Sequence, residues 1–102
     1  MEDARSELLA VLQEARAYLA RPDNDFGWSR WKGSGEALSE LDSLIAAIQM
    51  GSPFKKMDLV ILFAPTGAIQ EVGMSSGWGW EFLELSKRFD EAEQRFFASE
   101  SL

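Results

Sequence analysis

The sequence predicts an α+β fold in which three α-helices pack with one two-stranded antiparallel β-hairpin, in the order helix, helix, strand, strand, helix. Three observations predict it. Apolar residues recur at helical spacing in three long segments, residues 59–63 form a short, partly β-branched apolar run, and a proline- and glycine-containing turn follows that run. The chain has 102 residues, of which 46% are hydrophobic and 26% are charged. This balance is typical of one compact domain, so we expect a single domain over residues 1–102.

The first two helices are predicted over residues 3–20 and about 35–50. Pro22 ends the first because its ring disfavours helical geometry at the preceding residue. Ser34 is the expected N-cap of the second, and Gly51 its left-handed C-cap. The apolar positions that set the helical period are Leu8, Leu12, Ala15 and Leu19 in the first helix and Leu38, Leu41, Leu44, Ile45 and Ile48 in the second.

Residues 26–33 connect these helices with the sequence Phe-Gly-Trp-Ser-Arg-Trp-Lys-Gly. The segment is too aromatic for a solvated loop and too rich in glycine for a regular element. We expect it to fold over the core as an ordered lid, called the aromatic lid below.

The hairpin is predicted from strands at 59–63 and 68–74, joined by a turn at 64–67. Two strands alone are marginal in water, and both faces of the first are apolar, so the hairpin needs cover. We expect the cover to come from the aromatic lid, from a second copy that gives a four-stranded sheet in a homodimer, or from a different protein. The predicted interface residues of the hairpin are Val60, Leu62 and Ile69.

The last helix is predicted over about 77–97, with Ser75 or Ser76 as its cap. Its apolar residues alternate steps of four and three without a miss, at Trp78, Phe82, Leu85, Phe89, Ala92 and Phe96. This is the clearest periodicity in the chain.

The residue types present limit the chemistry. The chain has no cysteine and no histidine, which excludes disulfides, thiolate metal sites, imidazole ligands and Ser-His-Asp or Cys-His triads. The acidic run Asp23-Asn24-Asp25 lacks the glycine and glutamate that a calcium loop needs at its later positions. We therefore expect no enzyme activity, no metal and no cofactor.

The charge of the chain points to a class of partner. Seventeen acidic against ten basic residues give a net charge of -7, which disfavours nucleic acid and anionic membranes. No secretory signal follows Met1, and the apolar run 59–65 is too short to span a bilayer. We expect a cytoplasmic protein. The second helix carries Glu36 and Glu40 one turn apart and no basic residue, an acidic face that would attract a basic partner.

Two further segments are candidate binding sites. The turn at 73–80 contains Ser75, Ser76 and Gly77 and could present N–H groups to an anion at a helix start; the alternative is simple capping. The tryptophans fall in two short segments, with Phe26, Trp28 and Trp31 in the aromatic lid and Trp78 and Trp80 beside the turn. They form either part of the core or an aromatic recognition patch.

These observations favour a protein-interaction module, such as a regulator or inhibitor of a basic partner. The composition resembles that of small toxin-neutralising immunity proteins. The alternative function is binding of a small anionic ligand by the 73–80 turn and the tryptophans.

Overall fold

The computed structural model describes residues 3–100, and over these residues the chain is all-helical and forms no strand. The prediction of an α+β fold with a β-hairpin is therefore wrong. The elements in order are α1 (Ala4–Leu19), α2 (Ser34–Met50), α3 (Lys56–Val60), a 3₁₀ turn η1 (Ile61–Phe63), α4 (Ala68–Ser76) and α5 (Gly79–Glu100).

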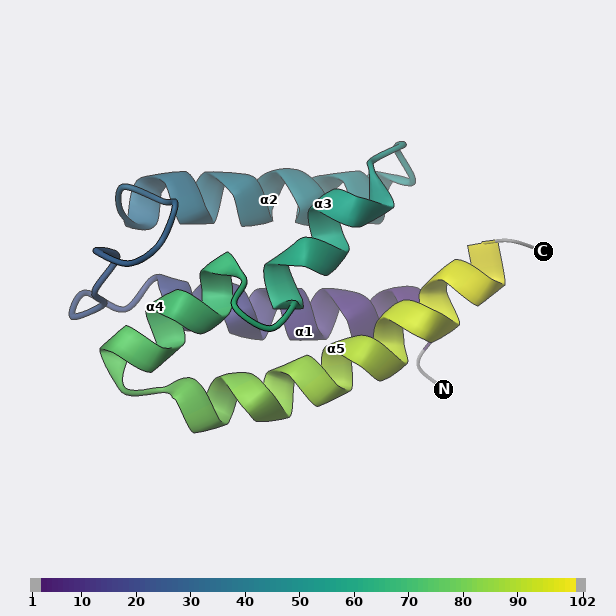
Figure 1. Cartoon of the computed structure of the whole chain (residues 1–102). Coiled ribbons are helices and arrows are strands. Elements are labelled where there is room, and N and C mark those ends of the chain that lie inside the picture. The colour runs from purple at the N-terminus through teal and green to yellow at the C-terminus, as the bar shows by residue number, and fades with distance from the viewer. Residues whose placement is uncertain (1–2, 101–102) are drawn as a thin grey trace.

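Helix α1 is the centre of the bundle. It packs along both α2 and α5 and also contacts α4. The short elements α3, η1 and α4 lie between α2 and α5 on the side of α1 that faces the viewer (Figure 1). They close the core that the three long helices leave open.

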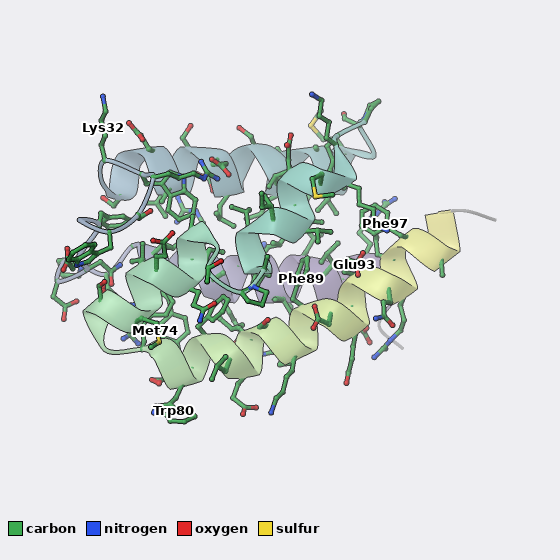
Figure 2. All side chains as sticks on the ribbon, in the orientation of Figure 1. Lys32, Met74, Trp80, Phe89, Glu93 and Phe97 are labelled. Atoms are coloured by element: carbon green, nitrogen blue, oxygen red, sulfur yellow. The ribbon has the colours of Figure 1, made fainter. Side chains whose placement is uncertain are left out.

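The three long helices are confirmed close to the predicted boundaries. Gly51 has a φ of 70°, the left-handed C-cap that the sequence predicts. Ser34 is the first helical residue of α2 rather than its N-cap, a position taken by Gly33, which supplies no side-chain cap. The predicted periodic residues of these helices line the core, which Phe89 enters from α5 (Figure 2).

The predicted hairpin is replaced by α3, η1 and α4. In the segment 59–63, Leu59, Leu62 and Phe63 are buried, a spacing of three and one that fits a helix and not alternation. In 68–74 the buried residues are Ala68, Ile69, Val72 and Gly73, again on one helical face. Without strands, the homodimer through joined hairpins loses its basis.

The sequence Ala64-Pro65-Thr66-Gly67 is a break between helices and not a hairpin turn. Thr66 has a φ of 62°, in the left-handed region that a β-branched residue rarely adopts. A methyl group on Gly67 would lie 2.6 Å from the carbonyl oxygen of Ile61 and 2.8 Å from that of Ala64. The tight approach of the backbone therefore requires glycine at 67.

Substitutions at Thr66 and Gly67 should change the free energy of unfolding in opposite directions. Thr66→Asn should raise the free energy of unfolding by up to about 1 kcal/mol, because asparagine tolerates positive φ and keeps the backbone N–H bonded to Gln70. Gly67→Ala should lower it by about 1–3 kcal/mol through overpacking. Urea denaturation measures both; a destabilising Thr66→Asn would show that the left-handed geometry carries no strain.

By length and composition alone, the segment 56–76 could cross a membrane, a criterion that core segments of globular proteins also meet. In the structure this segment is not one helix, because the break at 64–67 divides it. Its buried side chains, which include Phe63, face the core of the bundle, whereas Met57, Ile61 and Met74 are exposed.

Candidate docking groove

The tryptophans divide into a buried and an exposed pair. Trp31 and Trp78 are 3% and 1% exposed, whereas Trp28 and Trp80 are 76% and 82% exposed. Figure 2 shows Trp80 projecting outward from α5. One tryptophan of each predicted segment thus belongs to the core and one to the surface, and Phe26 is half-buried against the core.

Trp78 joins three segments. Its ring stacks on Tyr18 of α1 at a centroid distance of 5.0 Å, and its Nε1 donates to Asn24 Oδ1 at 2.9 Å. Asn24 in turn donates to the backbone oxygen of Tyr18. Gly73 of α4 lies against the ring, where a Cβ would come within 2.9 Å. The loop after α1 is therefore fixed to the α4–α5 junction through this indole.

The turn at 73–80 ends one helix before it begins the next. Ser75 and Ser76 are the last residues of α4, and Gly77 follows as a left-handed C-cap with a φ of 89°. Neither serine caps α5, so that prediction is wrong. Ser76 Oγ accepts the N–H of Asp25 at 2.8 Å. The two serines and Gly77 therefore lie at a helix C-terminus, whose carbonyl oxygens repel anions, and the anion site stays a prediction.

Beside that turn lies a small exposed apolar patch formed by Met74, Trp80 and Leu83. Met74 packs over Gly79, whose Cβ would meet its sulfur at 2.6 Å. The residues surround a shallow hollow of about 400 Å³. Figure 2 shows Met74 and Trp80 on the same side of the molecule.

The largest hollow is a groove of about 990 Å³ between α2 and α3, called the α2–α3 groove below. One wall is α2, the other is formed by α3 and η1, and the aromatic lid closes one end. Its lining is mostly charged or polar, with three carboxylates and one guanidinium. The lining residues are Arg30, Trp31, Gly35, Glu36, Ser39, Glu40, Ser43, Leu44, Asp58 and Ile61.

Arg30 of the aromatic lid is clamped on the α2 wall. It donates through both terminal nitrogens to the two carboxylate oxygens of Glu40, one bond measuring 2.9 Å. Its guanidinium carbon lies 5.0 Å from the centroid of the Trp31 ring, and Trp31 Nε1 also donates to Glu40. The hydrogen bonds from Arg30 hold the pKa of Glu40 below its usual value, although burial opposes the shift.

The other two carboxylates of the groove form no ion pair among residues 3–100, although both attract the Arg30 guanidinium at longer range. Glu36 is exposed and accepts only the backbone N–H of Lys32 at 3.1 Å. Asp58, on the opposite wall, is exposed, and among residues 3–100 no basic side chain forms an ion pair with it. The groove therefore keeps an excess of negative charge after Arg30 and Glu40 neutralise each other.

Elsewhere, basic side chains are used to join helices. Arg16 pairs with Asp42 between α1 and α2, and Arg88 with Glu14 between α5 and α1. Two further pairs, Arg95 with Glu7 and Lys56 with Glu93, bring α5 to α1 and α3. These exposed pairs are individually weak, but they leave the surplus acids without basic neighbours.

The predicted interface residues separate into two groups. Leu62 and Ile69 are fully buried and Val60 is half-buried, so the hairpin set forms no exposed face. Glu36 and Glu40 both line the groove, although Glu40 is paired and only Glu36 is open. Three lining residues, Arg30, Asp58 and Ile61, are not predicted from the sequence. Nothing in the local pattern places these residues near α2, because their position depends on how the lid and α3 pack.

No three His, Cys, Asp or Glu side chains among the described residues are placed to hold a metal ion.

The inter-helix ion pairs predict a pH dependence of stability. Hydrogen bonds from arginine lower the pKa of Glu14, Glu40 and Asp42 in the folded protein. Their stabilising contribution is complete above the unfolded pKa and is lost as the pH falls through the lower, folded pKa. Without histidine, Tm should be nearly constant between about pH 6 and 8 and should fall below about pH 4.5, the usual glutamate pKa.

The control for this prediction is R16Q/R30Q/R88Q, in which the three carboxylates lose their arginine partners. Because their pKa values return toward the unfolded ones, Tm of this variant should fall less steeply in acid. An unchanged slope would show that other groups cause the acid sensitivity.

In comparisons with known proteins, no family model, curated protein or solved structure matches this chain.

Proposed function

We propose that this protein is a non-enzymatic, cytoplasmic module that binds a basic protein through the α2–α3 groove. The observation that carries the proposal is the charge of the groove walls. Glu36 on α2 and Asp58 on α3 line the same hollow, both are exposed, and neither forms an ion pair among the described residues, so three carboxylates face the single guanidinium of Arg30.

The groove also offers apolar contact beside its charge. Ile61 is 52% exposed on the η1 wall, and Leu44 and Trp31 form part of the floor with little exposure. Met57, one helical turn before Ile61, is also exposed. Interfaces of protein complexes combine such apolar contacts with a polar rim. A partner segment carrying both cationic and aliphatic side chains would satisfy both parts of the groove.

The charge of the whole chain supports the same partner class. A net charge of -7 attracts a basic protein over distances set by ionic strength and speeds its association. The helix-joining ion pairs occupy many of the basic side chains, and Arg30 is the one basic residue among those that line the groove.

Quantitative affinity capture from host lysate tests the proposal when three forms are compared in parallel. The first is the wild type and the second is the groove variant E36Q/D58N. The third is E81Q/E84Q, which removes the same charge from exposed positions on α5. We expect the wild type and E81Q/E84Q to retain a basic partner that E36Q/D58N loses, with retention falling as salt rises.

Equal capture of that protein by all three forms would refute the groove as the binding site. Loss of capture only in E81Q/E84Q would do the same and would assign binding to the surface around Trp80. Circular dichroism checks that all three forms are equally folded.

A further inference from the structure

We propose that the α2–α3 groove recognises an arginine side chain of its partner, in the place that Arg30 holds in the free protein. This inference rests on the proposed function, since it names the group that the basic partner inserts. The structure contains a guanidinium already seated in the groove, which shows what chemistry the site accommodates.

The seat is built from Glu40 of α2 and from Trp31, a residue of the aromatic lid whose side chain is fixed in the core. Glu40 presents both carboxylate oxygens to Arg30, and the Trp31 side chain is only 3% exposed. Trp31 Nε1 holds Glu40 at 3.2 Å independently of Arg30. The contact between Trp31 and Glu40 therefore does not depend on Arg30, and we expect it to remain when the Arg30 side chain is displaced or removed.

Arg30 itself is the exchangeable part. It comes from the aromatic lid, which has no regular helix, and its side chain is 54% exposed. Its hydrogen bonds go to Glu40 and its ring contact is with Trp31, while Asp58 and Glu36 attract it at longer range. Exposed ion pairs of this kind are worth little, so a partner that adds contacts to Ile61, Glu36 or Asp58 can displace it.

The geometry selects arginine over lysine. A guanidinium is planar and donates two parallel hydrogen bonds to one carboxylate while stacking on an aromatic ring. Arg30 does both at once, on Glu40 and Trp31. An ammonium group would keep the charge attraction but lose the two parallel hydrogen bonds and most of the stacking on the ring.

Titration of Arg30→Ala with methylguanidinium tests the proposal, with Trp31 followed by fluorescence or by its indole N–H resonance. Removing Arg30 vacates the seat, so this variant should bind the probe at least tenfold more tightly than the wild type. Methylammonium should show no comparable gain. The matched control is Arg21→Ala, which removes an arginine stacked on Tyr18 outside the groove; it should bind like the wild type.

Adding Glu40→Gln to Arg30→Ala should abolish the gain in methylguanidinium affinity, because the carboxylate that accepts both hydrogen bonds is removed. The inference is overturned if Arg30→Ala binds no more tightly than the wild type, if methylammonium gains equally, or if the gain survives Glu40→Gln. Arg30→Met repeats the test with the aliphatic stem retained, in case the shorter side chain alters the lid.

The two proposals fail separately. If Arg30→Ala gains guanidinium binding while captured proteins ignore Glu36 and Asp58, the clamp stands and the proposed function falls. If a basic partner depends on Glu36 and Asp58 but no gain appears, only the arginine inference falls.

Discussion

Trp78→Ala should lower the free energy of unfolding by about 3–5 kcal/mol, the range for truncating a large buried aromatic residue. The indole is 1% exposed, stacks on Tyr18 and fills the space above Gly73. Its removal also leaves Asn24 without the donor that anchors the loop after α1. Guanidinium chloride denaturation followed by circular dichroism measures the loss.

Trp80→Ala is the matched control, since it removes the same side chain two residues away. Trp80 is 82% exposed, so the change in unfolding free energy should stay within about 0.5 kcal/mol, as for surface substitutions generally. Equal losses in the two variants would contradict the assignment of one tryptophan to the core and one to the surface.

Charge reversal in the groove should produce the largest functional effect. We expect E36K/D58K to weaken binding of the captured basic partner more than a hundredfold, because like charges placed across an interface cost several kcal/mol. Both side chains are exposed and form no ion pair within residues 3–100, so the fold should tolerate the change. Isothermal titration calorimetry at fixed salt measures the affinity.

The control for charge reversal is E81K/E84K, which changes the net charge by the same amount on α5. General attraction to a basic partner weakens equally in both variants, so any difference between them reports on local contact. Comparable losses would mean that the partner senses only the overall charge of the protein.

The long helices could be predicted from the sequence because their apolar periods run over several turns. The apolar run 59–63 could not be assigned, since five apolar residues in a row show neither a period of two nor one of 3.6. The proline and glycine at 65 and 67 then suggested a hairpin turn, whereas they separate two helices. Tertiary packing decides the matter, because it buries Leu59, Leu62 and Phe63 together and stacks Phe63 on Phe82 and Phe89 of α5.

The candidate site was only partly visible in the sequence. The acidic face of α2, with Glu36 and Glu40, follows from helical spacing alone. The return of Arg30 onto Glu40 and the position of Asp58 on the facing wall depend on packing between elements. Which tryptophan is buried and which is exposed could not be predicted either, because Trp78 and Trp80 lie in the same short glycine-containing segment. They differ in that Trp78 packs on Tyr18 of α1, and only the tertiary structure shows this.

The most direct measurement is a map of the binding surface by backbone amide chemical shifts of the labelled protein, titrated with the captured basic partner. We expect the perturbed amides to cluster in 30–44 and 57–61, the segments that line or flank the groove. Perturbations confined to the patch of Met74, Trp80 and Leu83, with the groove unaffected, would contradict it.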